Sequence, residues 1–85
     1  MNTVLDAPAI LARLRELVAG RIAVDPAALS LDARLADIGI DSFSLIELVF
    51  VAEEEFGIKI PMEGLRPETV GDVVEVIEHY LASER

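Results

Sequence analysis

Residues Leu35–Gly57, LADIGIDSFSLIELVFVAEEEFG, place a glycine turn, a helix cap and an amphipathic helix in direct succession. Gly39 permits the turn, and Asp41 is a strong N-cap residue because its carboxylate accepts hydrogen bonds from the free amides of a first helical turn. Gly57 is a typical C-cap residue. The segment therefore predicts a helix over Ser42–Phe56, with a serine hydroxyl at its start.

This helix presents apolar residues on two opposite sides when it is plotted at about 100° per residue. The wider side has the spacing of a helix that packs on a core, and its members are Leu45, Leu48, Val49, Ala52 and Phe56. The opposite side carries Phe43, Glu47, Phe50 and Glu54, with Val51 on one margin and Ile46 and Glu53 on the other. Phenylalanines one above the other, rimmed by carboxylates, indicate a surface on which a partner docks.

The chain has 85 residues and a net charge of −9, which limits the classes of partner it can bind. A chain of this length forms one small domain, and its hydrophobic content of 53% is enough for a single core. The segment 36–58 holds six acidic residues and no basic residue. A field of one sign attracts basic surfaces and repels phosphates, so we expect protein partners and no nucleic acid.

The composition also limits the compartment and the chemistry. No apolar run reaches the roughly 18 residues that span a bilayer, and the N-terminus lacks the basic start of a signal peptide. We therefore expect a cytoplasmic protein with no membrane partner. We also expect a monomer. Because the chain has no cysteine, it has no disulfide, no thiolate metal ligand and no cysteine nucleophile, and any thiol has to come from a prosthetic group.

The N-terminal region predicts a first helix over about residues 7–23 from the helical spacing of its apolar residues. Asp6 is expected to cap it and Pro8 to lie in its first turn. Gly20 is expected inside the helix or at a close-packing point. The Asp25-Pro26 pair ends the helix, because a residue before a proline avoids the α region.

The connection over residues 26–40 is too apolar for a free linker. We expect one short helical turn at Pro26–Leu29 and leucine side chains that reach the core. The apolar residues concerned are Leu29, Leu31, Leu35 and Ile38.

The C-terminal region predicts a loop, a short helix and a long helix. Ile58–Ile60 alternates like a strand but has no partner strand, so we expect an extended loop. A short third helix is expected around Met62–Leu65, and Thr69 with Asp72 predicts the capping box of a last helix. Its apolar stripe is Val70, Val73, Val74, Ile77, Tyr80 and Leu81. The expected fold is all-α, a small four-helix bundle of three main helices and one short helix.

Several groups of residues occur in the order typical of one family. They are Gly39-Ile40-Asp41-Ser42-Phe43 after Leu35, then Glu47-Leu48-Val49, Glu53-Glu54-Glu55-Phe56-Gly57-Ile58-Lys59-Ile60-Pro61, and Thr69-Val70-Gly71-Asp72-Val73-Val74. Over roughly residues 5–82 the chain resembles an acyl carrier protein. The resemblance implies a 4′-phosphopantetheine arm on Ser42, with Asp41 as the flanking cap that a phosphopantetheinyl transferase recognises. It also implies a free-standing, single acyl-carrier domain over residues 1–85 that is not itself an enzyme.

The sequence departs from the usual pattern of that family at two residues beside the motif. Phe43 stands where leucine is usual, and Ser44 stands where many relatives have an acidic residue. Ser44 lies about 200° around the helix from Ser42 and within the helix body, so Ser42 alone occupies the helix start. We call the expected partner-binding surface the docking face; it consists of Phe43, Ser44, Glu47, Phe50, Val51, Glu53 and Glu54.

The resemblance implies acyl intermediates held as thioesters and passed between enzymes. Partners of this kind are an acyltransferase, a ketosynthase or an acyl- or aminoacyl-loading ligase. The departures at Phe43 and Ser44 favour polyketide or related secondary-metabolite biosynthesis over fatty-acid biosynthesis. A peptidyl or aminoacyl carrier protein is an alternative. Another is an unmodified acidic helical adaptor that binds a basic partner through Phe43 and Phe50.

Catalytic and metal-binding functions are not supported by the residues present. A Ser-His-Asp hydrolase would need a catalytic histidine, and the only histidine is His79, on a helix beside Glu75 and Glu78. The acidic run Glu53–Glu55 points in three directions on a helix, and no calcium-loop pattern is present. We therefore expect no catalytic residue and no metal site.

Overall fold

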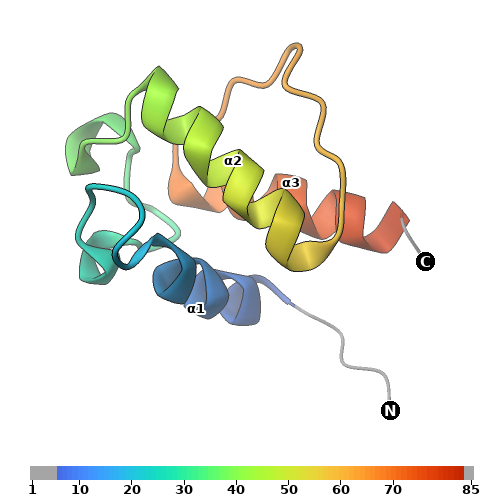
Figure 1. Ribbon diagram of the computed structural model, residues 1–85, viewed down its shortest axis with the longest axis horizontal. Coiled ribbons are helices and arrows are strands. Elements are labelled where there is room, and N and C mark those ends of the chain that lie inside the picture. The colour runs from blue at the N-terminus through green and yellow to red at the C-terminus, as the bar shows by residue number, and fades with distance from the viewer. Residues whose placement is uncertain (1–5, 84–85) are drawn as a thin grey trace.

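A computed structural model describes residues 6–83, which form three α-helices joined by long connections. The helices are α1 (Ala7–Val18), α2 (Ser42–Phe56) and α3 (Val70–Ser83). Two single turns of 3-10 helix, η1 (Pro26–Ala28) and η2 (Ala36–Ile38), lie between α1 and α2. Figure 1 shows α2 in front, α3 passing behind it and α1 below. The predicted all-α architecture is confirmed, and α2 has the predicted bounds.

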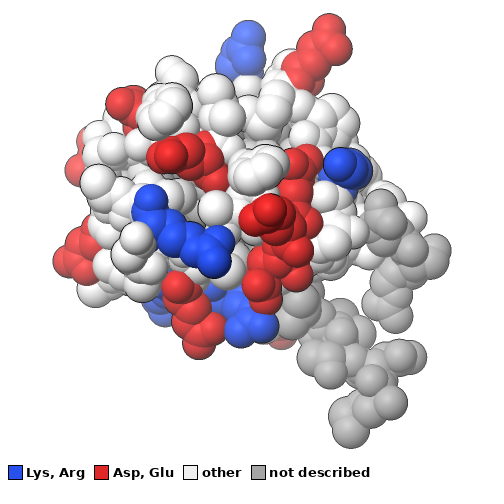
Figure 2. All heavy atoms as spheres, in the orientation of Figure 1, with Lys and Arg blue, Asp and Glu red and all other residues white. Residues whose placement is uncertain are grey.

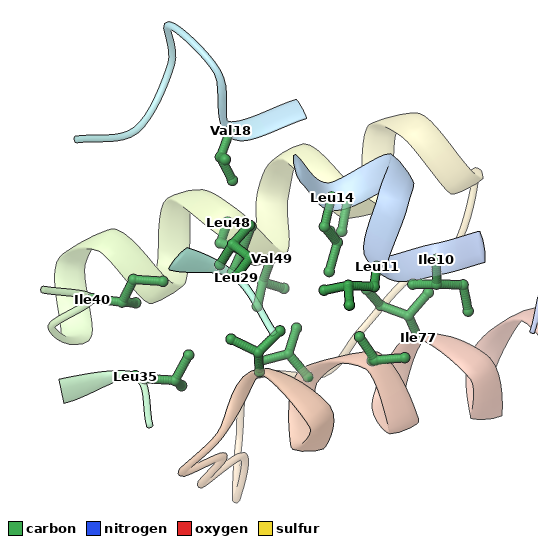
Figure 3. Close-up of a cluster of buried hydrophobic side chains, with 14 of the residues drawn as sticks. Ile10, Leu11, Leu14, Val18, Leu29, Leu35, Ile40, Leu48, Val49 and Ile77 are labelled. Atoms are coloured by element: carbon green, nitrogen blue, oxygen red, sulfur yellow. The ribbon is translucent and has the colours of Figure 1, made fainter. Parts of the chain in front are cut away.

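The core is built from aliphatic side chains of all three helices and of the connections. Figure 3 shows these side chains pointing toward a shared interior. The labelled residues are Ile10, Leu11, Leu14, Val18, Leu29, Leu35, Ile40, Leu48, Val49 and Ile77. Within residues 6–83 no polar or charged side chain is buried, so the fold is held by hydrophobic burial.

α1 is shorter than predicted, because it ends at Val18 rather than near residue 23. Ala19 is extended, with φ −61° and ψ 119°, so the helix has ended before Gly20, whose φ of 77° a right-handed helix cannot contain. A Cβ atom at Gly20 would meet no heavy atom within 4 Å, so the predicted close-packing role is wrong as well. Ile22 is buried after the helix has ended, and its contribution to the apolar pattern explains the overlong prediction.

The predicted caps of α1 and α3 are confirmed. The Oδ1 atom of Asp6 accepts the amide of Ala9 at 3.1 Å. At the start of α3, Thr69 Oγ1 accepts the Asp72 amide at 3.1 Å, and Asp72 Oδ2 accepts the Thr69 amide at 3.1 Å. The same Oδ2 accepts the Glu68 amide at 2.9 Å. These bonds lower the pKa of Asp72, and the bond from the Glu68 amide has the largest effect.

The connection between α1 and α2 packs on the core at some of the predicted residues. The predicted helical turn at Pro26–Leu29 is confirmed as η1, and both Leu29 and Leu35 are buried. Leu31 is 40% exposed, so the prediction that it reaches the core is wrong. η2 has no periodic sequence signal, since a single 3-10 turn is too short to produce one.

The connection between α2 and α3 is an extended segment followed by a tight turn. Ile58 and Ile60 are buried and lie outside any helix or strand, which confirms the predicted loop. The predicted short helix at Met62–Leu65 is wrong, because this segment makes a single turn closed by the Leu65 amide and the Met62 carbonyl at 3.0 Å. Gly64 has a φ of 79°, which a right-handed helix cannot contain.

The two connections are joined by backbone hydrogen bonds at the start of α3. The Val70 amide donates to the Ala33 carbonyl at 3.0 Å, and the Gly71 amide donates to the Leu31 carbonyl at 2.8 Å. A Cβ atom at residue 71 would lie 2.7 Å from that Leu31 oxygen, so only glycine allows this approach. These bonds place the segment before η2 against the segment before α3.

Candidate functional site

The start of α2 is built around Asp41, as predicted. Asp41 is extended, with φ −90° and ψ −172°, and its Oδ1 accepts the Ser44 amide at 2.9 Å. That bond is the largest cause of the lowered pKa of Asp41. The chain reaches this cap through Gly39, whose φ of 85° ends η2, and through the buried Ile40. The helix start is therefore fixed by a local cap and by one core side chain.

Ser42 is the first residue of α2 and is exposed to solvent. The free amides of a helix N-terminus carry a partial positive charge, which favours a negatively charged group nearby. Ser44 differs from Ser42, because it is half-buried and its amide already serves the Asp41 cap. The structure thus brings Asp41 and Ser42 together at one exposed point.

A groove of about 480 Å³ lies beside Ser42. Its walls are the segments 34–36, 40–42 and 65–68, together with Leu45. The Leu35 amide donates to the Glu68 carbonyl at 2.9 Å, and this bond holds two of the walls together. Sequence reasoning missed the groove, because its walls come from connections that only the tertiary fold brings close.

Leu65 and Pro67 separate this groove from a small enclosed space between α2 and α3. The space measures about 10 Å³, close to the volume that a single water needs. Its lining is entirely apolar, and the other residues that line it are Val49, Ala52, Ile60, Val73, Val76 and Ile77. An apolar group could enter here only by displacing these side chains.

The docking face lies on the outward side of α2 and includes large exposed apolar residues. Phe43 is 69% exposed and Phe50 is 58% exposed. Ile46, expected on the margin, is 53% exposed and extends the apolar surface. Glu54 is exposed, whereas Glu47 is half-buried, as are Val51 and Ser44. Figure 2 shows acidic side chains along the course of α2 with uncharged surface between them.

Glu53 has a structural contact that its place on the docking face does not suggest. Its Oε2 atom accepts the amide of Ile60 at 2.7 Å, and so ties the connection after α2 back onto the helix. Glu55 is also engaged, because its Oε2 lies 2.7 Å from Nε of Arg13 on α1. Of the acidic run, only Glu54 makes neither a hydrogen bond nor an ion pair among residues 6–83.

The remaining candidate chemistry of the chain is sparse within the described residues. His79 is exposed, and its ring meets Tyr80 edge-on with centroids 4.8 Å apart. No group of three or more His, Asp or Glu side chains in residues 6–83 is arranged to hold a metal ion. No helix in the same range is long and apolar enough to cross a membrane.

Known proteins match this sequence over most of the chain. Residues 12–77 match the family described as "Phosphopantetheine attachment site". An acyl carrier protein of Treponema pallidum subsp. pallidum is 44% identical over 68 residues, which cover 78% of this chain and 87% of the relative. The chain belongs to the acyl carrier protein family. A relative of the same name from Amoebophilus asiaticus is 39% identical over 81% of this chain and 89% of its own length. Another, from Thermosynechococcus vestitus, is 37% identical over 87% of this chain and 94% of its own length.

As an acyl carrier protein, the chain is non-catalytic and carries a covalent 4′-phosphopantetheine arm. Such carriers work with a phosphopantetheinyl transferase and with acyl-handling enzymes. The fold agrees with this identity, since its three helices and absence of strands within residues 6–83 are those of a helical carrier.

The residues at the start of α2 fit such an arm. A phosphodiester on a serine needs an accessible hydroxyl and surroundings that tolerate negative charge. Ser42 is exposed, makes no side-chain hydrogen bond within the described chain, and lies at a helix N-terminus beside a groove. Two other serine hydroxyls of the described chain are engaged: Ser30 donates to Asp32 and Ser83 to the His79 carbonyl.

Proposed function

We propose that Ser42 is the attachment residue for the arm, with Asp41 as the cap that presents it to the transferase. The observation that carries this proposal is the exposed, unbonded Ser42 hydroxyl at a capped helix start. In the transfer, the Ser42 oxygen attacks a phosphorus of the coenzyme A pyrophosphate, the anhydride bond breaks, and 3′,5′-ADP leaves. The transferase supplies the base that takes the hydroxyl proton, and Mg²⁺ that offsets the negative charge.

Once attached, the arm supplies the thiol that the chain itself lacks, and an acyl group is held on it as a thioester. The chain anchors the arm at Ser42 and keeps the start of α2 rigid through the Asp41–Ser44 hydrogen bond. We propose that residues 1–85 act as one such carrier domain, as a cytoplasmic monomer.

We propose polyketide or related secondary-metabolite biosynthesis as the pathway, with fatty-acid biosynthesis as the second candidate. Support comes from the aromatic, exposed Phe43 and from the uncharged Ser44 beside the attachment residue. The partners would then be an acyltransferase, a ketosynthase or a loading ligase.

Phe43→Leu with Ser44→Asp should raise the rate of loading by a fatty-acid type acyltransferase and lower it for a polyketide type enzyme. Equal rates before and after the exchange would remove the argument for a specialised pathway.

The docking face is the surface we propose for these partners. Phe43 and Phe50 supply apolar contacts, and the carboxylates around them, with Glu54 the most available, attract a basic rim on the partner. A carrier meets several enzymes in turn, so each contact is expected to be small and transient.

The decisive test is intact-mass measurement after co-expression with a broad-specificity phosphopantetheinyl transferase. The wild type should gain the mass of one phosphopantetheine group, Ser42→Ala should gain none, and Ser44→Ala should be modified like the wild type. Ser44→Ala is the matched control because it removes the same atom two residues away.

Modification that persists in Ser42→Ala would overturn the assignment to this residue. A wild type that stays unmodified would favour the unmodified adaptor. Loading assays on the modified protein with acyl and aminoacyl ligases then separate an acyl carrier from a peptidyl carrier.

A further inference from the structure

Arg34 and Arg66 both line the groove beside Ser42, one from the residue before Leu35 and the other from the connection before α3. We propose that these two arginines bind the phosphodiester that joins the arm to Ser42. They would hold the first part of the arm in the groove and leave its thiol end free. This inference rests on the proposed attachment at Ser42.

The backbone fixes the place from which each arginine extends. Arg34 forms an isolated antiparallel bridge with Thr69, and the neighbouring Leu35 amide donates to the Glu68 carbonyl at 2.9 Å. These contacts set the segment of Arg34 against the segment of Arg66, although the two are far apart in the sequence. The two side chains therefore extend from two walls of the groove that this backbone bond holds together.

Both guanidinium groups have donors available for a ligand. Among residues 6–83, neither Arg34 nor Arg66 has a carboxylate oxygen within 4.0 Å, and Arg66 makes one bond, from Nη1 to the Leu65 carbonyl at 3.1 Å. Arg13 differs, because it is paired with Glu16 and Glu55. A guanidinium has five N–H donors, and its planar fork matches the oxygens of a phosphate.

The charges around the groove show why a phosphodiester on Ser42 would need nearby cations. Asp41 and Glu68 also line it, so its four charged side chains sum to zero, while the chain as a whole carries −9. The Asp41 carboxylate is turned to the Ser44 amide and stays ionised. A phosphodiester on Ser42 adds a further negative charge beside it. Arg34 and Arg66 are the cations in this groove that can offset that charge, through charge-assisted hydrogen bonds.

The experiment compares the unmodified and the modified protein by NMR of the arginine side chains and of phosphorus. Complete loading is first established by intact mass. On loading, the Nε resonances of Arg34 and Arg66 should shift, and that of Arg21, an exposed arginine outside the groove, should not. The phosphorus resonance should move in Arg34→Gln/Arg66→Gln and stay unchanged in Arg21→Gln. Added salt should reduce the arginine shifts.

Each outcome decides the proposal. Fully loaded protein whose Arg34 and Arg66 resonances equal those of the unmodified protein overturns the arginine contact and leaves the attachment at Ser42 intact. Absence of the added mass on Ser42 overturns both proposals. Because both side chains are exposed, the double variant should keep the wild-type thermal midpoint, and the loaded fraction can be purified if loading is slow.

Discussion

The two faces of α2 differ in burial although they belong to one continuous helix. On the inward face, Leu48, Val49 and Ala52 are 2%, 4% and 0% exposed. On the outward face, Phe43 and Phe50 are 69% and 58% exposed. Burying a large apolar side chain stabilises a fold by about 1.5–3 kcal/mol. The inward residues contribute this stabilisation, and the outward phenylalanines contribute little of it.

This difference separates the residues that stabilise the carrier from those that are available to its partners. The inward face meets side chains of α1 and α3 in the core, as Figure 3 shows for Leu48, Val49 and Ile77. Phe43 and Phe50 on the outward face do not pack against the core, and carboxylates rim them. Paired substitutions on the two faces should therefore act on different measurements.

Leu48→Ala should have the largest effect on stability. Leu48 is 2% exposed, and removal of a buried leucine side chain costs about 2–5 kcal/mol. Ile46→Ala, two residues away and 53% exposed, is the matched control and should change the free energy of unfolding by less than about 0.5 kcal/mol. Urea denaturation followed by circular dichroism measures both. Equal losses in the two variants would mean that the helix is rotated from the orientation described.

Phe56→Ala and Phe50→Ala should have opposite consequences. Phe56 is half-buried against the core, so its loss should cost up to about 3 kcal/mol. Phe50→Ala should leave the unfolding free energy near that of the wild type and weaken binding of an acyl-handling partner, measured by calorimetry. If Phe50→Ala unfolds the protein and Phe56→Ala does not, the two faces are assigned backwards.

Glu53 and Glu54 are neighbours that should also behave differently. Glu53→Ala leaves the Ile60 amide without its acceptor, and loss of a hydrogen bond to a charged group costs about 1.5 kcal/mol or somewhat more. Glu54→Ala should have no measurable effect on unfolding. Faster hydrogen exchange at the Ile60 amide in Glu53→Ala alone would identify the broken contact, whereas equal exchange in both variants would exclude it.

The start of α2 should make stability depend on pH at the acidic end. The folded-state pKa of Asp41 is lowered by its bond to the Ser44 amide. The carboxylate therefore stabilises the fold fully above its unfolded pKa, about 3.9, and this contribution is lost as the pH falls through the lower folded value. Asp72 acts in the same direction.

Asp41→Asn tests this dependence, because asparagine caps a helix but does not titrate in this range. The thermal midpoint of the wild type should exceed that of Asp41→Asn above about pH 5. The two midpoints should converge as the pH falls through the lowered folded-state pKa of Asp41, because the carboxyl group is then neutral in both the folded and the unfolded protein. A difference that stays constant over the whole range would show that the cap does not depend on the charge of Asp41.

The sequence was sufficient to predict α2 and its cap, because the signals for both are local. Asp41, the regularly spaced apolar residues and Gly57 all lie within or beside the helix. Each of them favours a backbone conformation at residues close to it in the sequence. The glycines at 20 and 64 were harder to interpret, since a left-handed glycine and a helical glycine look alike until the packing around them is known. The groove beside Ser42 joins segments that are far apart in the chain, and the Glu53–Ile60 bond depends on how the backbone turns after Gly57, so no helical or strand period could have revealed them.

The smallest effect on stability is expected for Glu54→Lys, which reverses an exposed charge on the docking face. It should leave the thermal midpoint nearly unchanged and slow both modification by the transferase and loading by an acyl-transferring enzyme, because the encounter with a basic partner loses its attraction. Glu75→Lys, an equal charge change at an exposed residue of α3, is the matched control and should slow neither reaction to the same extent. The difference between the two variants should shrink as salt is raised above about 0.15 M, where the Debye length is already about 8 Å. Equal slowing by both variants would show that partners respond to the total charge of the carrier rather than to the outward face of α2.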